Sequence, residues 1–303
     1  MIIKGILSLL YFMSHFCATL YAQGEIRNIN GVQLYTRVIG EGKPIVIVHG
    51  GPGLDHSYLL PQMGELGKYF RLILFDLRAS GRSSVDIDSN SMTLENLIED
   101  IDGIRKSFGV QKVNLMGHSW GGFLAMSYAI KYPEHISSLL LINTVPASSK
   151  RRDETERISR SRITKEDSAA RSALLRTEAF RKRTPDAMAS LFRIVFGGSF
   201  YDRRYADSLT LTFQSNYSSS SAMLQYLFKD QTLRQYDLHQ KLGTIQCPTL
   251  LLGGDHDQVS PDVLQEIHIS ISSSKLVILK NCGHFSYIEC KEDFVAAVKD
   301  FLK

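Results

Sequence analysis

A serine stands between two glycines in the stretch Gly117-His-Ser-Trp-Gly121, directly after an apolar run at residues 113–116. A short apolar run of this kind predicts a buried strand, and residues 123–130 suit a helix. Ser119 would then lie where a strand turns sharply into a helix. Side chains two positions away on either side would crowd such a turn, which explains the two glycines. This pattern is typical of a turn that exposes a nucleophilic serine at the carboxyl end of a sheet.

A serine hydroxyl needs a general base to act as a nucleophile at neutral pH, and that base needs an acid to orient it. His284 follows the last apolar strand run and is the predicted base. Two aspartates follow the preceding strand run. Asp257 lies far enough past that strand to reach a histidine, whereas Asp255 is expected to cap the loop or to pair locally. His256 is the rival base, and its place beside the acid favours a role in the loop.

A glycine-rich turn, His-Gly-Gly-Pro-Gly at residues 49–53, follows another apolar run. Such a turn exposes backbone N–H groups, which can stabilise the negative charge that develops on a carbonyl oxygen during acyl transfer. The predicted donors of this oxyanion hole are the N–H groups of Gly51 and of Trp120, the residue just after the serine. The alternative is a tight turn without any part in catalysis.

Strand and helix patterns alternate around these residues. An alternating run at 32–38 predicts an early antiparallel strand, and continuous apolar runs predict buried strands at 44–50, 71–76, 113–117, 138–143, 248–254 and 275–279. Apolar residues at helical spacing predict helices at 93–108, 261–269 and 291–302. The alternation indicates βαβ units, and therefore an α/β fold with a mostly parallel central sheet flanked by helices.

This alternation stops between residues 150 and 237, where we find no strong strand pattern. The segment holds 17 Lys and Arg against 11 Asp and Glu. A solvated helical surface is the simpler interpretation of such a charge run, and a basic rim that attracts an anionic substrate or surface is the functional one. Apolar side chains predict that one face packs on the main domain; they are Met188, Leu191, Phe192, Ile194, Val195 and Phe196. The segment is therefore predicted to be a helical cap.

The N-terminus has the features of a secretory signal peptide. Lys4 is the only charged residue before Glu25, and an apolar core lies between them, followed by a predicted cleavage point after Ala22. The protein is therefore expected to be exported, periplasmic or secreted, without a stable membrane span after cleavage; an uncleaved anchor and a buried helix are the alternatives. The predicted division is a signal peptide at 1–22, the first part of the core at 23–145, the cap at 146–240 and the second part of the core at 241–303.

Composition limits the remaining possibilities. The 303 residues are 44% apolar and 22% charged, as in an ordinary globular protein, and the net charge of +4 makes no case for a nucleic-acid partner. Cleavage would leave Cys247, Cys282 and Cys290, whose spacing resembles no zinc site, so buried free thiols are expected. Neither a metal nor an organic cofactor is expected, and the sequence gives no indication of the oligomeric state.

The order serine, acid, histidine along the chain is the order of the α/β-hydrolases, which the chain resembles from about residue 33 to its end. The turn at 49–53 is similar to the His-Gly-Gly-Pro-Gly motif of proline iminopeptidases and related S33-type peptidases. Residues 76–83 resemble the Asp-Gln-Arg-Gly-x-Gly-x-Ser loop of the same family, although Leu77 and Ala79 depart from it. We expect this loop to buttress the oxyanion turn.

The resemblance implies an α/β-hydrolase fold and a proline-iminopeptidase-like aminopeptidase. Such an enzyme would release N-terminal residues from small peptides through an acyl-enzyme on Ser119, with Asp257 and His284 completing the triad. Iminopeptidases bind the substrate's free amino group with cap glutamates, but residues 213–217, where one is expected, hold no acid. Substitutes could come from Glu178, Asp202 and Asp230, and a basic cap is an awkward place for an ammonium group.

Two alternatives use the same fold. A carboxylesterase or lipase-like enzyme would hydrolyse small esters with the same residues and would be indifferent to a free amino terminus. A non-catalytic ligand-binding member of the fold is the third reading. The simultaneous presence of the serine, the aspartate and the histidine argues against it, because binding alone does not require all three.

Overall fold

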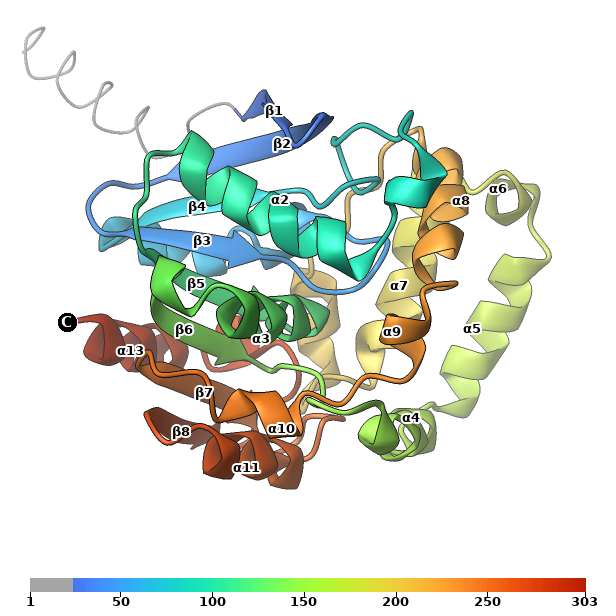
Figure 1. Cartoon of the computed structure of the whole chain (residues 1–303). Coiled ribbons are helices and arrows are strands. Elements are labelled where there is room, and N and C mark those ends of the chain that lie inside the picture. Colours follow the sequence, from blue (N-terminus) through green and yellow to red (C-terminus); the bar gives the residue numbers. More distant parts are fainter. Residues whose placement is uncertain (1–23) are drawn as a thin grey trace, which may run out of the picture.

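The computed structural model describes residues 24–303, through which an eight-stranded sheet runs in the order β1-β2-β4-β3-β5-β6-β7-β8 (Figure 1). The strands from β4 to β8 in this order are parallel, and β1 and β2 are antiparallel. Their bounds are β1 Glu25–Ile29, β2 Val32–Ile39, β3 Pro44–Val48, β4 Arg71–Phe75, β5 Val113–His118, β6 Ile136–Ile142, β7 Thr249–Gly254 and β8 Ser274–Leu279. The predicted α/β architecture with a mostly parallel sheet is confirmed. The predicted signal peptide at 1–22, including Ala22, lies outside the described residues.

Alternate side chains of each central strand enter two separate apolar cores. In β3, Val46 and Val48 face one core, and Ile45 and Ile47 face the other. The first core is covered by α2 (Leu94–Ser107), α3 (Trp120–Lys131), α10 (His239–Leu242) and α11 (Pro261–Ser270). The second is covered by α12 (Ser286–Glu289), α13 (Lys291–Leu302) and two short 3₁₀ helices, η1 (His56–Leu59) and η2 (Met63–Lys68). Because both faces are buried, the strands read as continuous apolar runs.

Six of the helices between β6 and β7 lie beyond the carboxyl ends of the parallel strands (Figure 1). They are α4 (Arg152–Ser161), α5 (Lys165–Leu175), α6 (Glu178–Arg181), α7 (Pro185–Gly197), α8 (Tyr217–Leu227) and α9 (Gln231–Arg234). Helix α7 turns Phe196 onto the core, where its ring lies 5.3 Å from that of Phe285. Val195 was predicted to belong to the same packed face, but it is 48% exposed.

The segment that leads from β6 into these helices pairs with the segment that leads from them back to β7. Ser148 and Asp237 form an antiparallel bridge. Ser149 N–H donates to Tyr236 O at 2.9 Å, and Leu238 N–H donates to Ala147 O at 2.9 Å. These backbone hydrogen bonds fasten the two connecting segments together at the base of the helical region.

Two predictions made without reference to the site can be compared with the described residues. Within residues 24–303, no helix has both the length and the apolar character that crossing a bilayer requires. The three cysteines of this part are free; Cys282 is buried as expected, but Cys247 and Cys290 are only half-buried.

Candidate active site

Ser119 is the one residue between β5 and α3, and its backbone has φ +55° and ψ −122°. An L-residue rarely adopts such a conformation, and the surrounding contacts must hold it. Ser119 N–H donates to Ile142 O at 3.0 Å. A Cβ at Gly117 would lie 2.3 Å from Gly121 O, and a Cβ at Gly121 would lie 2.3 Å from Val48 O. The backbone of the turn therefore excludes side chains at both positions. Helix α3 begins directly after the serine, three residues before the predicted start.

A chain of hydrogen bonds runs from the serine hydroxyl through a histidine to a carboxylate. Ser119 Oγ lies 2.9 Å from His284 Nε2. On the other side of the ring, Nδ1 lies 2.8 Å from Asp257 Oδ1 and 3.0 Å from Asp257 Oδ2. The imidazole and the carboxylate are buried. The three predicted residues thus meet at one edge of the sheet, with each histidine nitrogen facing a different partner.

Asn143, which the sequence analysis did not assign to the site, holds the aspartate from behind. Its side-chain amide donates to Asp257 Oδ2 at 2.8 Å and to Gly283 O at 3.0 Å. It also accepts a hydrogen bond from Ser286 Oγ at 2.6 Å. Asn143 is fully buried and has φ +45° at the end of β6. A polar residue that ends a buried apolar strand was the only sequence signal for it.

The two neighbours of the predicted acid take local roles. Asp255 lies 3.6 Å from Lys280 Nζ, and its Oδ1 accepts the N–H of Cys282 at 3.4 Å. The ring of His256 packs edge-on against Tyr201, with 5.4 Å between the ring centroids. Both observations agree with the predicted roles of Asp255 and His256 in the loop.

The glycine-rich turn at residues 49–53 lies against the serine turn. Gly51 has φ +54°, which favours glycine, and the carbonyl of Gly51 accepts the N–H of Leu54 at 2.9 Å. Trp120 is the first residue of α3, where backbone N–H groups have no acceptor inside the helix. Within residues 24–303, neither the N–H of Gly51 nor that of Trp120 has a hydrogen-bond acceptor. Both are therefore available to a bound oxygen.

A buried relay connects this turn to the histidine loop. Gly50 N–H donates to Tyr58 Oη at 2.7 Å, Tyr58 Oη lies 2.7 Å from His118 Nδ1, and His118 Nε2 lies 3.0 Å from His284 O. Burial lowers the pKa of His118 to about 3, so its ring is neutral. Because a carbonyl can only accept, Nε2 carries the proton and Nδ1 accepts the Tyr58 hydroxyl. Neither Tyr58 nor His118 was given this role from the sequence.

The loop at residues 76–83 supports the same turn. Asp76 Oδ1 accepts the backbone N–H and the Nδ1–H of His56 at 3.0 and 2.6 Å, and its Oδ2 accepts the N–H of Arg82 at 2.9 Å. Leu77 N–H donates to His49 Nε2 at 3.1 Å. Burial lowers the pKa of His49, and a neutral ring can accept this hydrogen bond. The loop is thus tied to His49, the first residue of the turn, and to His56 in the segment that follows it, which agrees with the expected supporting role.

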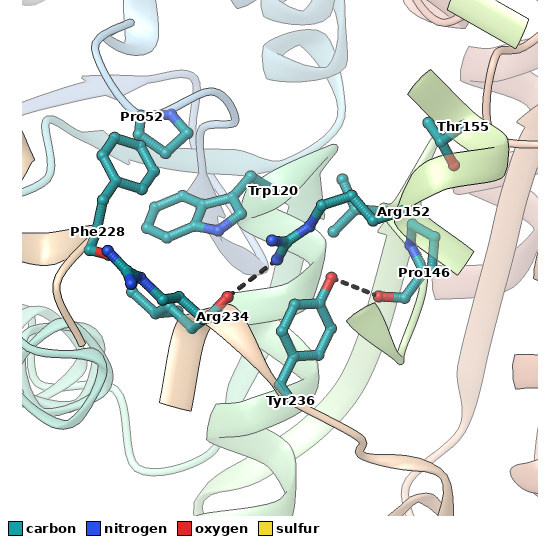
Figure 2. Close-up of a pocket in the computed structure, with 10 residues that line it drawn as sticks. Pro52, Trp120, Pro146, Arg152, Thr155, Phe228, Arg234 and Tyr236 are labelled. Carbon is teal, nitrogen blue, oxygen red and sulfur yellow. Dashed lines mark hydrogen bonds between the residues drawn. The ribbon is translucent and has the colours of Figure 1, made fainter. Parts of the chain in front are cut away.

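A cavity of about 360 Å³ lies beside the Trp120 side chain (Figure 2). It is lined by Trp120, by Pro52 next to Gly51, and by residues of the cap helices and of the segments next to them. The remaining lining residues are Val145, Pro146, Arg152, Thr155, Phe228, Leu233, Arg234 and Tyr236. The lining is mostly apolar and aromatic, with two arginines and no acidic side chain.

The three acids considered as cap anchors are engaged elsewhere. Glu178 is paired with Lys182, and Asp202 caps the 3₁₀ helix η6 (Arg203–Ser208). Asp230 caps α9 and accepts the N–H of Leu94 at 3.1 Å. None of these carboxylates lines the cavity beside Trp120. The segment at 213–217 approaches the glycine-rich turn through Tyr217, whose hydroxyl would lie 3.3 Å from a Cβ at Gly53.

One cluster of possible metal ligands lies near the turn. Asp55, His56 and Asp76 offer ligand atoms within 4.8 Å of one another. However, Asp76 already accepts from His56, and Asp55 accepts the N–H of Ser57 at 2.8 Å. These hydrogen bonds give the cluster a structural explanation, and the proposed chemistry does not use it.

Comparisons with known proteins point to one family. Residues 43–290 match the alpha/beta hydrolase fold family. The chain is 26% identical to a proline iminopeptidase of Saccharolobus solfataricus, over 96% of each chain. It is 30% identical to a proline iminopeptidase of Pestalotiopsis fici, over 92% of this chain and 99% of the relative. A crystal structure of a proline iminopeptidase from Mycobacterium smegmatis matches with a TM-score of 0.68 at 22% identity, covering 92% of this chain and 97% of that one.

The family match spans most of the chain, and the sheet order and the strand–serine–helix turn agree with it. The chain therefore belongs to the α/β-hydrolase fold family, in which it resembles the proline iminopeptidases and is a hydrolase of the peptidase or esterase kind.

Proposed function

We propose that the protein is a serine hydrolase that acts through an acyl-enzyme on Ser119. The observation that carries this proposal is the 2.9 Å contact between Ser119 Oγ and His284 Nε2, with Asp257 behind the ring. In the first step Oγ attacks the substrate carbonyl while His284 takes the hydroxyl proton. Asp257 holds the ring and stabilises its charged form. The N–H groups of Gly51 and Trp120 bind the oxyanion of the tetrahedral intermediate.

The second half of the cycle reverses these roles. His284 returns the proton to the leaving group as the scissile bond breaks, which leaves the acyl group on Ser119. A water molecule then attacks the acyl carbonyl and gives its proton to His284. Collapse of the second intermediate releases the acid and restores the Ser119 hydroxyl. No step of this cycle uses a metal or an organic cofactor.

The first substrate candidate is a short peptide with an N-terminal proline. It is supported by the His-Gly-Gly-Pro-Gly turn and by relatives that are named proline iminopeptidases. The second candidate is a small ester. It is favoured by one observation: the cavity beside Trp120 presents arginines and no acid to a bound substrate. An amino-terminal ammonium group would have no carboxylate there.

One experiment separates these candidates and tests the mechanism. Purified protein and its Ser119→Ala variant are assayed on a prolyl arylamide with a free amine and on a short-chain nitrophenyl ester. The variant should lose at least about 10⁴-fold in kcat on whichever substrate is cleaved, because the nucleophile is gone. Its circular dichroism spectrum should match that of the wild type. Full activity in Ser119→Ala would overturn the mechanism.

The substrate follows from which reaction depends on Ser119. Cleavage of the arylamide that is lost when the amine is blocked would establish the aminopeptidase. Ester cleavage alone would establish the esterase, and the resemblance to iminopeptidases would then reflect a shared oxyanion turn.

A further inference from the structure

We infer that the cavity beside Trp120 binds a carboxylate group of the substrate, and that Arg152 and Arg234 hold this group. The inference rests on the proposed function, because it takes the cavity to receive the substrate of Ser119. Its place supports this: Trp120 carries one proposed oxyanion donor, and Pro52 follows Gly51, which carries the other. Ser119 and His284 do not line the cavity themselves, so a substrate would reach it from the reacting carbonyl past Trp120.

The charged side chains that line the cavity are both positive. Arg152 and Arg234 are its only ionised side chains among the residues that line it in the described part of the chain. Aromatic and aliphatic side chains make up most of the remainder, and both arginines are themselves exposed to solvent. A bound anion would form solvent-accessible contacts with these guanidinium groups, which are weaker than buried ion pairs but can still add up when two cations face one anion.

Both guanidinium groups are held in place without being neutralised. Arg152 Nη2 donates to Leu233 O at 2.9 Å, and Arg234 Nε donates to Phe228 O at 2.8 Å. The Arg152 guanidinium also lies 5.7 Å from the centroid of the Tyr236 ring. Each of the two hydrogen bonds uses one N–H of a group that has five. Figure 2 shows the Arg152 guanidinium beside the Trp120 ring, and the Arg234 guanidinium at the edge of the cavity against the backbone of Phe228.

The neighbouring arginine shows the contrast. Arg151 forms ion pairs with Glu154 and Glu266, so its charge is already balanced. Arg152 and Arg234 form no ion pair with a carboxylate among residues 24–303. A planar guanidinium matches a carboxylate through two parallel hydrogen bonds, which makes a substrate carboxylate the natural partner.

The carboxylate could belong to the acyl part or to the leaving group, and paired substrates separate these sources. Nitrophenyl hydrogen glutarate is compared with nitrophenyl pentanoate for the acyl side, and carboxyphenyl butyrate with phenyl butyrate for the leaving side. In one of the two pairs, kcat/KM should favour the carboxylated member by about 10- to 100-fold. Equal values within both pairs would refute the inference, while turnover of the neutral esters would leave the proposed function standing.

Three substitutions test the assignment to these residues. Arg152→Gln and Arg234→Gln should each remove most of the preference, measured as the ratio of kcat/KM between the carboxylated and the neutral member of the pair. Arg160→Gln is the matched control, because Arg160 lies on the same helix as Arg152, pairs with Glu156 and does not line the cavity. An equal loss in the Arg160→Gln variant would attribute the preference to the general charge of the cap and overturn the site.

A binding measurement avoids any need for turnover. Trp120 is the only tryptophan of the chain and lines the cavity, so its fluorescence reports on occupancy. In the Ser119→Ala background, benzoate should bind at least about tenfold more tightly than benzamide, and Arg234→Gln should abolish the difference. Equal binding, or no fluorescence change with either compound, would contradict the inference even if no ester were hydrolysed.

Discussion

Both carboxylate oxygens of Asp257 lie within hydrogen-bond distance of His284 Nδ1. Asp257 itself accepts hydrogen bonds from the side chain of Asn143 and, at 3.0 Å, from the N–H of Val259. An acid fixed in this way selects the tautomer in which Nδ1 carries the proton, so that Nε2 is free to accept the proton of Ser119. The orienting group therefore acts on the nucleophile without touching it. The same argument makes Asn143 a positioning residue for the acid.

The two aspartates of the loop should differ sharply when changed. Asp257→Asn should lower kcat by about 10⁴-fold, because an amide that donates to Nδ1 stabilises the wrong tautomer. Asp255→Asn should cost less than about tenfold, because Asp255 contacts only the loop and Lys280. Steady-state kinetics of both variants on one substrate test the pair, and the reverse ranking would reassign the acid.

A buried carboxyl beside the oxyanion turn should make stability depend on pH. Burial, together with the charge of Asp76, raises the pKa of Asp55 from 3.8 to about 6. The folded state then holds this proton more tightly than the unfolded chain, so protonation of Asp55 stabilises the folded state. This stabilisation is complete below pH 3.8 and is lost as the pH rises to about 6.

Asp55→Asn should remove this dependence, since an amide does not titrate and can still accept the N–H of Ser57. Relative to the wild type, the variant's free energy of unfolding should increase by roughly 1–3 kcal/mol across that pH interval. Urea unfolding at several pH values measures the change. A free energy of unfolding that changes with pH in the same way in both proteins would contradict this prediction.

At the scale of the elements, the strand β5 and the helix α3 can meet only because their junction lacks side chains. Gly121→Ala would place a Cβ 2.3 Å from Val48 O and 2.6 Å from His49 O, and neither backbone atom can move without shifting β3. We expect a loss of at least about 3 kcal/mol in the free energy of unfolding. Gly243→Ala is the matched control, because its nearest contact would be an ordinary 3.9 Å, and it should change stability by less than about 1 kcal/mol. Similar stability of the two variants would show that the junction can relax.

The local pattern of each element decides how much of the fold could be predicted from the sequence. Buried parallel strands read as apolar runs, so β3 to β8 were predictable, and the turn chemistry located Ser119 within one of them. Strand β1 was missed because its sequence, Glu-Ile-Arg-Asn-Ile, is mostly exposed and has no apolar run. The roles of Asn143 and Tyr58 were missed for another reason. Their partners Asp257 and His118 lie 114 and 60 residues away, and no local pattern encodes such a contact.

For the molecule as a whole, we propose export through the N-terminal signal peptide, followed by cleavage after Ala22. Mass spectrometry of the exported protein should then show a chain that begins at Gln23. A Leu9→Arg variant places a charge in the apolar core of the signal and should remain unprocessed, which provides the control. Exported protein that retains Met1 would refute the cleavage.

The bridge between Ser148 and Asp237 closes the helical region into a loop, which also contacts the core through Phe196 and Arg162. The nucleophile, the base and the acid all belong to chain segments outside that loop, yet half or more of the cavity wall belongs to it or to its two ends. During evolution the loop can therefore be lengthened, shortened or exchanged, which changes the substrate, while the residues that carry out the reaction stay the same. In this architecture, substrate preference and catalytic chemistry can evolve separately.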